Sequence, residues 1–289
     1  MPINESELIL NPDGSVYHLN LKPEHVAKTI IFVGDQDRVE QVSKHFDTID
    51  FKTQKREFKT HTGTFKGTRL SVISTGIGSD NIDIVLNELD ALFNIDLKTR
   101  QPKTELTRLE IIRIGTSGSL QTDIPVDTFV LNTHALDLNG MLNFYKTKSI
   151  CDVKMETAFI NHTNWHPNKA RPLLVKNSTL LEEKFESEVT FKGVTATACG
   201  FYGPQGRILR LAVKNEMLNE KMESFNFNGL RITNLEMETS AIYGLSKLLG
   251  HHAISLNAII ANRAHGTFSK NPMQVVENLI TYTLYKIIE

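Results

Sequence analysis

Short apolar runs rich in β-branched residues recur along the chain, and most lead into stretches whose apolar residues recur every three or four positions. The short runs predict buried strands, and the spaced stretches predict amphipathic helices. Strands are expected at residues 29–33, 51–65, 69–74, 110–112, 128–136, 189–199, 230–235 and 253–261, and helices from residue 39 and at 80–93, 178–186, 208–222, 236–249 and 275–288. This alternation predicts an α/β fold with a parallel or mixed central sheet, arranged as a single domain over residues 1–289.

Three of the predicted strands end at glycine-bearing turns that begin at Gly34, Gly76 and Gly115. Glycine lets the backbone approach a ligand closely, and successive backbone N–H groups with Thr and Ser hydroxyls can hold an oxyanion. The stretch 115–119, Gly-Thr-Ser-Gly-Ser, is expected to be such a loop, and the guanidinium of Arg113 beside it suits phosphate oxygens. The alternative is a tight turn after a core strand, with Arg113 in a structural salt bridge. A dinucleotide-binding fingerprint is excluded, because Asn81 stands where its third glycine would be required.

A glycine-rich loop at residues 200–207 carries side chains that suit a planar ring. Phe201 offers a stacking face, while Gln205 and Arg207 can hydrogen-bond a ring that has two carbonyls and an N–H.

Two carboxylates, Glu236 and Glu238, stand at the start of a predicted helix. A carboxylate there opposes an anion but can accept hydrogen bonds from sugar hydroxyls. Alternatively, Glu236 is a structural partner for Arg207 or Arg263. Groups for phosphate, ribose and base occur together, and this combination indicates a nucleoside and its phosphorolysis.

Composition narrows the class of protein further. A formal net charge of −1 gives no reason to expect nucleic acid or an anionic membrane as a partner. Cys151 and Cys199 are isolated and lack metal-ligand spacing, so we expect neither a disulfide framework nor a metal site, and we expect a reducing, cytoplasmic location. The first ten residues have no signal-peptide pattern, and no apolar run approaches the length of a membrane span.

The order of these motifs resembles that of the nucleoside phosphorylase-I family, and the resemblance runs from about residue 17 to the last predicted helix. It implies a three-layer αβα domain with a central mixed sheet. The loop Phe201-Tyr202-x-x-Gln205-x-Arg207 and the segment Ile260-Ala261-Asn262-Arg263 are similar to the uridine branch of the family, whereas purine members have an aspartate after the equivalent strand. The remaining matches are Gly34-Asp35-Gln36-Asp37-Arg38, Thr75-Gly76-Ile77-Gly78, Arg113-Ile114-Gly115-Thr116 and Glu236-Met237-Glu238.

The resemblance implies which residues bind each part of the substrates. His18 and Arg56 would reach in from the neighbouring subunit, and Arg207, Gln205 and Arg113 would be the catalytic residues. By binding site, the implied residues are Gly34, Arg38, Arg56, Arg113 and Thr116 for phosphate; His18, Met237 and Glu238 for ribose; and Phe201, Gln205, Arg207, Glu236 and Arg263 for the base.

The resemblance also implies phosphate-dependent cleavage of uridine to uracil and ribose 1-phosphate, with inorganic phosphate as co-substrate. It implies no cofactor and no firm metal site, and leaves open a monovalent cation, potassium, near Glu57 and Ile77. A homo-oligomer, either a dimer or a trimer of dimers, would share its active sites across subunit interfaces. Two alternatives remain: a purine nucleoside phosphorylase or nucleosidase of the same fold, and a catalytically silent nucleoside-binding protein.

Overall fold

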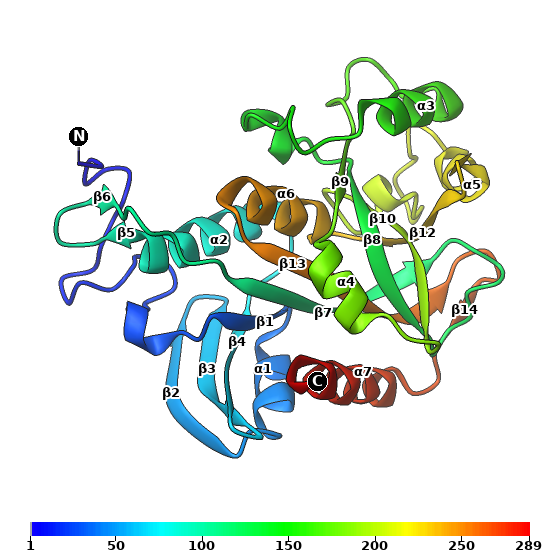
Figure 1. Ribbon diagram of the computed structural model, residues 1–289. Coiled ribbons are helices and arrows are strands. Elements are labelled where there is room, and N and C mark those ends of the chain that lie inside the picture. Colours follow the sequence, from blue (N-terminus) through cyan, green and yellow to red (C-terminus); the bar gives the residue numbers. More distant parts are fainter. Residues whose placement is uncertain (1) are drawn as a thin grey trace.

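The computed structural model describes residues 2–289, and a mixed sheet of 12 strands organises the chain (Figure 1). Along its main path the strands lie in the order β11-β12-β10-β8-β13-β7-β1-β4-β3-β2. Off this path, β9 pairs with β8 and β14 pairs with β13, while β5 and β6 form a separate two-stranded sheet. The strands are β1 (Thr29–Val33), β2 (Thr48–Lys55), β3 (Phe58–Phe65), β4 (Thr68–Ser74), β5 (Ile95–Asp96), β6 (Gln101–Pro102), β7 (Glu110–Ser119), β8 (Phe129–Asp137), β9 (Leu173–Lys176), β10 (Thr190–Thr197), β11 (Asn226–Phe227), β12 (Leu230–Glu236), β13 (His252–Asn262) and β14 (Thr267–Phe268). The helices are α1 (Gln36–Ser43), α2 (Ser79–Asn94), α3 (Val153–Thr163), α4 (Thr179–Phe185), α5 (Leu218–Ser224), α6 (Thr239–Leu249) and α7 (Pro272–Ile288), with 3-10 turns η1 (Pro23–His25), η2 (Met141–Phe144) and η3 (Gly203–Gln205).

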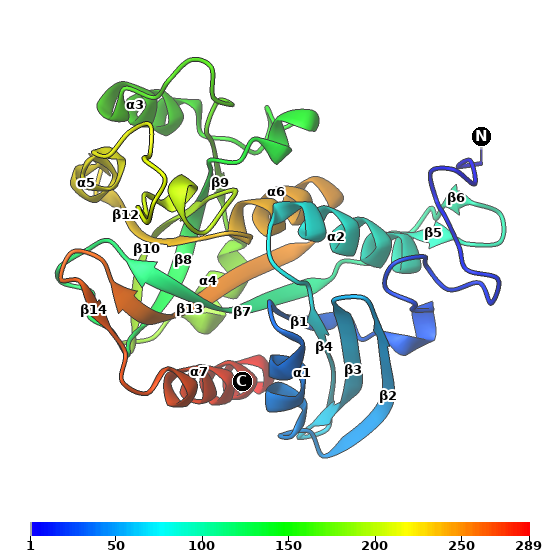
Figure 2. The same cartoon turned by 180° about the vertical axis from the view of Figure 1, so that it is seen from behind.

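Helices cover both faces of the sheet. In Figures 1 and 2, α2 and α6 lie on one side of the central strands, and α1 and α7 lie on the other. Strand β1 illustrates how both faces of the sheet become buried, because alternate side chains of a strand point to opposite faces. Ile30 and Phe32 pack in the core beneath α2 and α6, while Ile31 and Val33 pack in the core against α1 and α7. The predicted α/β fold with three layers and a central mixed sheet is therefore confirmed.

The direction of the strands gathers three predicted turns at one edge of the sheet. Strand β1 runs parallel to both β4 and β7, and β7 runs parallel to β13. The carboxyl ends of parallel strands meet at the same edge, which is where ligands bind in open α/β sheets. The turns after β1 and β4 and the second half of β7 therefore lie close together.

The stretch 115–119 is strand rather than loop, which corrects the sequence-based expectation. β7 continues through Ser119 because its backbone pairs with β13, where Gly115 lies opposite Asn257. On the side that faces β13 the backbone groups of this stretch belong to the sheet, whereas on the other side β1 pairs with β7 only as far as Arg113 and β12 only at Gly118 and Ser119. Position 115 requires glycine for a different reason, because a Cβ there would lie 1.7 Å from Nη1 of Arg113 and 2.6 Å from Oδ1 of Asn257.

Several other boundaries differ from the prediction. The helix expected at 208–222 is reduced to α5, because the apolar residues before it face solvent; Leu209 is 76% exposed and Leu211 is 79% exposed. Residues 51–65 divide into β2 and β3, with a turn at which Arg56 adopts a φ of 55°. The helix α3 lies in a region whose sequence showed no clear pattern.

The single-domain organisation over residues 1–289 stays a prediction. Among residues 2–289, no helix is both long and apolar enough to cross a membrane.

Candidate active site

A cavity of about 790 Å³ lies at the carboxyl edge of the central strands. It is lined by residues of the turns after β1 and β4, the second half of β7, the loop around η3, the junction between β12 and α6, and the end of β13. The lining includes twelve of the residues singled out from the sequence: Gly34, Arg38, Glu57, Ile77, Arg113, Thr116, Phe201, Gln205, Arg207, Glu236, Met237 and Glu238.

One end of the cavity is cationic. Asp35 begins α1 as its N-cap, accepting a hydrogen bond from the backbone N–H of Asp37 at 2.9 Å, and this turn places Arg38 on the cavity wall. Burial lowers the pKa of Arg38, and the nearby positive charge of Arg113 lowers it further. Two neighbouring guanidinium groups favour an anion between them.

Arg113 projects from β7 and is only 7% exposed. Its Nη2 donates a hydrogen bond to the carboxylate of Glu238, and its Nη1 donates to Oδ1 of Asn257 at 3.0 Å. Burial alone would lower the pKa of Arg113, but the carboxylates of Glu238 and Glu236 more than offset it, so its pKa is raised. The structural salt bridge considered from the sequence is thus present, yet the same guanidinium still lines the cavity.

Glu238 connects the cationic end to the middle of the cavity. Its Oε1 accepts a hydrogen bond from the backbone N–H of Gly78 at 2.8 Å, so a residue after β4 fixes its orientation. Burial raises the pKa of Glu238, and Arg113 opposes that rise. A carboxylate with this support has lone pairs left to accept hydrogen bonds from hydroxyl groups in the cavity.

The carboxylate of Glu236 caps helix α6. Its Oε2 accepts hydrogen bonds from the backbone N–H groups of Glu238 and Thr239 at 2.9 and 2.8 Å, and its Oε1 accepts one from the Thr197 hydroxyl at 2.6 Å. These bonds satisfy donors at a helix N-terminus that otherwise lack partners. The guanidinium nearest to this carboxylate is that of Arg113, at 3.5 Å, so the alternative of a pairing with Arg207 or Arg263 is wrong.

The other end of the cavity is aromatic and amide-rich. The guanidinium carbon of Arg207 lies 3.7 Å from the ring centroid of Phe201, and its Nη1 donates to the side-chain carbonyl of Gln205 at 2.6 Å. Because the Gln205 carbonyl accepts this bond, its amide N–H groups are oriented away from Arg207. Burial lowers the pKa of Arg207, and it lowers that of neighbouring Arg263 to about 10 with help from the charge of Arg207.

Three predicted site residues, His18, Arg56 and Arg263, do not line the cavity of this subunit. His18 lies on the surface side of α2, where its Nδ1 is 2.6 Å from the carboxylate of Glu88. Arg56 lies near it, 5.9 Å from the ring centroid of Tyr17. Arg263 lies just behind the wall at the end of β13, with Nη1 lacking a partner among residues 2–289.

A model of the phosphorylase superfamily matches residues 28–285. The chain belongs to this superfamily. It is 30% identical over 267 residues to the uridine phosphorylase of Thermococcus kodakarensis, an alignment that covers 89% of this chain and 81% of that protein. The crystal structure of the Trypanosoma brucei nucleoside phosphorylase, described as showing uridine phosphorylase activity, superposes with a TM-score of 0.88 at 29% identity, covering 98% of this chain and 99% of that one. A DeoD-type purine nucleoside phosphorylase of Alkaliphilus metalliredigens is 26% identical, over 83% of this chain and 84% of that protein.

The phosphorylase cavity also contains lining residues that sequence reasoning did not assign to it. Ile260 and Ala261 of β13 and Phe268 of β14 all line it. The β13 pair could have been found, since it lies inside a motif already noted for the resemblance. Phe268 carries no sequence signal, because only the pairing of β14 with β13 brings it to the cavity.

The monovalent cation considered near Glu57 and Ile77 stays a prediction. Both residues line the phosphorylase cavity, but the side-chain Nδ2 of Asn81 donates to the Ile77 carbonyl at 3.4 Å. An amide donor at that carbonyl competes with a cation for the same oxygen. Among residues 2–289, no cluster of three or more His, Cys, Asp or Glu side chains could hold a metal ion.

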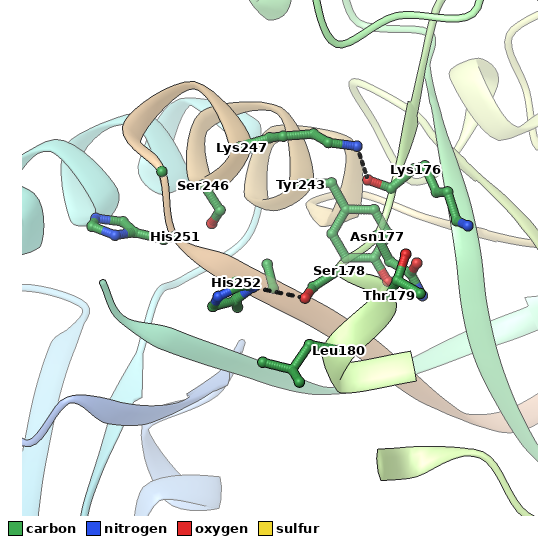
Figure 3. Close-up of a pocket in the computed structure, with 12 residues that line it drawn as sticks. Lys176, Asn177, Ser178, Thr179, Leu180, Tyr243, Ser246, Lys247, His251 and His252 are labelled. Carbon is green, nitrogen blue, oxygen red and sulfur yellow. Dashed lines mark hydrogen bonds between the residues drawn. The ribbon is translucent and has the colours of Figure 1, made fainter. Parts of the chain in front are cut away.

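A second, smaller cavity of about 390 Å³ lies at the C-terminal end of α6 (Figure 3). Lys176, Ser178, Lys247 and His252 are among its lining residues, and Ser178 is hydrogen-bonded to Nδ1 of His252 at 2.9 Å. None of the site residues predicted from the sequence lines this cavity. The larger cavity is therefore the candidate active site.

Proposed function

We propose that this phosphorylase cleaves uridine with inorganic phosphate, giving uracil and ribose 1-phosphate. The observation that carries the proposal is that the larger cavity has two different ends, a pair of guanidinium groups at one and a stacked Phe201–Arg207 pair with Gln205 at the other. A dianion, a sugar and a planar ring with carbonyl groups fit this arrangement in that order. The superfamily relatives named above support the same assignment.

Phosphate binds at the cationic end. Arg38 and Arg113 neutralise its charge, Gly34 allows the backbone to approach it, and the Thr116 hydroxyl offers a further donor. Arg113 has a catalytic role as well, because it fixes the position of the attacking phosphate oxygen.

Ribose lies in the middle of the cavity. Glu238 accepts hydrogen bonds from the 2′- and 3′-hydroxyls, and the backbone of Met237 lies beside them. Since Arg113 and Glu238 are hydrogen-bonded to each other, the two substrates are held at a fixed separation.

Uracil occupies the aromatic end, stacked on Phe201. Gln205 and Arg207 contact its polar edge, with Arg263 behind them and Glu236 at the side of the cavity. As a phosphate oxygen bonds to C1′, the C1′–N1 bond breaks and its electron pair passes to uracil. The sugar is cation-like at this point, as in other glycosyl transfers, and the charge on uracil spreads over its carbonyl oxygens. Arg207 and Gln205 stabilise that charge without transferring a proton.

His18 and Arg56 complete the site of a neighbouring subunit in a homo-oligomer, either a dimer or a trimer of dimers. Support comes from their positions, close to Tyr17 and absent from the lining of their own cavity. His18 would contact the ribose 5′-hydroxyl, and Arg56 would contact phosphate. We further propose a cytoplasmic location, in keeping with free thiols at Cys151 and Cys199.

A purine nucleoside phosphorylase is the second candidate, favoured by purine-specific relatives that match at 26% identity. Purine departure benefits from a carboxylic acid at the end of the strand equivalent to β13, and Asn262, the last residue of β13, stands there. The Nδ2 of Asn262 donates to the carbonyls of Gln121 and Ile124 at 2.9 and 2.8 Å, and so this amide is part of the framework. This arrangement disfavours purine substrates.

An ultraviolet assay of the purified protein with uridine or inosine, each with and without phosphate, tests the proposal. We expect uracil release only with uridine and phosphate together. Equal rates without phosphate would instead indicate hydrolysis, and activity on inosine alone would assign the protein to purines. Binding of either nucleoside without any turnover would indicate a silent binding protein.

A further inference from the structure

A continuous chain of buried side-chain hydrogen bonds begins at Arg113 and crosses four strands of the sheet. Nη1 of Arg113 donates to Oδ1 of Asn257 at 3.0 Å, and Nδ2 of Asn257 donates to Oδ1 of Asn132 at 2.6 Å. Nδ2 of Asn132 donates to Oδ1 of Asn234 at 2.8 Å, and Nδ2 of Asn234 donates to the hydroxyl of Ser117 at 3.1 Å. The chain thus leaves β7, passes through β13, β8 and β12, and returns to β7.

Every bond in this chain has the same direction. Each asparagine accepts through its carbonyl from the residue before it and donates through its amide to the residue after it. The three asparagines are 0% exposed, so water cannot replace a missing partner. Rotating any one amide by half a turn would place two donors or two acceptors face to face, at a cost that is large in a buried network.

Further hydrogen bonds fix the backbone at Asn132, in the middle of this chain of hydrogen-bonded side chains. The backbone carbonyl of Asn132 accepts hydrogen bonds from the Tyr243 hydroxyl at 2.6 Å and from Nδ2 of Asn177 at 3.3 Å. Tyr243 and Asn177 both line the second cavity, where Figure 3 shows them beneath α6. This contact fixes the backbone of β8 at Asn132.

We propose that Asn257 and Asn132 are positioning residues for phosphate, acting through the guanidinium of Arg113. The inference rests on the proposed role of Arg113 in binding phosphate. Glu238 holds Nη2 of Arg113 and Asn257 holds Nη1, so one bond from the N-cap residue of α6 and one from strand β13 set the plane of the guanidinium. The guanidinium fixed in this way lines the larger cavity.

The absence of a side chain at Gly115 makes room for this arrangement. A Cβ at that position would lie within 2.6 Å of both Nη1 of Arg113 and Oδ1 of Asn257, the two atoms that the first bond of the chain joins. The strand therefore leaves space at the point where the guanidinium meets the first amide. Without Asn257, the guanidinium would be held only by the carboxylates of Glu238 and Glu236, which draw it away from phosphate.

The test compares Asn257→Leu, which keeps the branching of the side chain but cannot accept a hydrogen bond, with Asn262→Leu as a matched control. Asn262 lies on the same strand and is 1% exposed, but its amide bonds to backbone carbonyls rather than to Arg113. We expect Asn257→Leu to raise the KM for phosphate at least about tenfold, the size expected for a hydrogen bond to a charged group, with a KM for uridine within about twofold of the wild type. Asn262→Leu should not raise the phosphate KM selectively.

Asn132→Leu, one bond further from Arg113, should raise the phosphate KM in the same way but by a smaller factor. Because the asparagines act in one chain, the double variant should be little worse than Asn257→Leu alone. Multiplicative effects of the two substitutions, or an unchanged phosphate KM in both single variants, would overturn the proposal. If Asn257→Leu fails to fold, the phosphate KM of Asn132→Leu alone tests the proposal.

Calorimetric titration with inorganic phosphate, in the absence of nucleoside, separates this proposal from the choice of substrate. The affinity for phosphate should fall by the same factor in Asn257→Leu whether or not uridine is the substrate. Equal affinities in the wild type and the variant, or no phosphate binding by the wild type, would each contradict the role assigned to the asparagines.

Discussion

The guanidinium of Arg207 lies over the ring of Phe201, with 3.7 Å between its central carbon and the ring centroid. Its Nη1 also donates to the backbone carbonyl of Phe201 at 2.5 Å and to the side-chain carbonyl of Gln205. The positive charge at this end of the cavity is thus fixed in position before any base binds. A preorganised charge of this kind stabilises a transition state without reorganisation at the moment of reaction.

Arg207→Ala should therefore lower kcat for uridine by about 10²–10³, the usual cost of losing one preorganised donor. The KM for phosphate should stay nearly normal, because Arg38 and Arg113 are unchanged. Arg207→Lys should recover little, since an ammonium cannot reproduce the guanidinium plane that stacks on Phe201. Steady-state kinetics with a uridine analogue whose base is more acidic provide the check. That base needs less help to leave, so Arg207→Ala should lose less kcat with the analogue than with uridine. If Arg207→Ala raises only the KM with every leaving group, Arg207 merely binds the base.

The positions of Arg56 and His18 predict active sites shared between subunits. Arg56→Ala and Arg113→Ala should each be inactive, because each removes a phosphate contact. Mixing the two variants under conditions that exchange subunits should restore part of the activity. At some interfaces the intact Arg113 of one subunit then meets the intact Arg56 of the other. Labelled subunits monitored by mass spectrometry would verify the exchange. Absence of recovery after verified exchange would count against a shared site.

Gly115→Ala should lower kcat/KM by at least about 10²-fold, because the added Cβ would occupy the space of the Arg113 guanidinium, and displacements near 1 Å have costs of that order. Gly118→Ala on the same strand is the comparison, since its Cβ would meet Cδ of Arg263 at 3.5 Å, an ordinary contact. Steady-state kinetics of both variants should show a much smaller loss for Gly118→Ala. Equal losses would mean that strand β7 tolerates no side chain here for reasons unrelated to Arg113.

The stability of the fold should fall in mild acid because of His134. Burial, with help from the charge of Lys176, lowers the pKa of His134 from 6.5 to about 4. Between these values the unfolded chain takes up a proton that the folded chain does not, so the free energy of unfolding decreases as the pH falls. The shift corresponds to at most about 3 kcal/mol for this residue. Urea unfolding at pH 7 and pH 4.5 should show a smaller pH dependence in His134→Gln, and an unchanged dependence would contradict this assignment.

Sequence patterns located most of the strands and helices because buried strands and amphipathic helices leave local periodicities. They failed where a distant partner decides the local structure. The stretch 115–119 looks like a loop by composition, but pairing with β13, more than a hundred residues later, makes it a strand. The apolar residues from Ile208 to Leu211 look helical, yet no core covers them and the helix begins only at Leu218.

The same limit applies to the cavity. Residues within glycine-bearing turns could be assigned from the sequence, since a turn and its charged neighbours are close along the chain. The contact of Arg113 with Glu238, and the bonds that join Asn257 to Asn132, connect residues more than a hundred positions apart. A single asparagine inside an apolar strand shows no pattern that would reveal such a partner.

The cavity is lined from Gly34 to Phe268, with β7 as the strand that joins the early elements to the late ones. During synthesis from the N-terminus, the elements of the cationic end leave the ribosome first, while β13, which β7 needs as its partner, is still to be made. Until then the half of β7 that faces the cavity lacks its neighbour, and Arg113 lacks both Asn257 and Glu238. The ability to hold phosphate should therefore appear late, after nearly the whole chain has emerged, so that an incomplete chain sequesters no substrate.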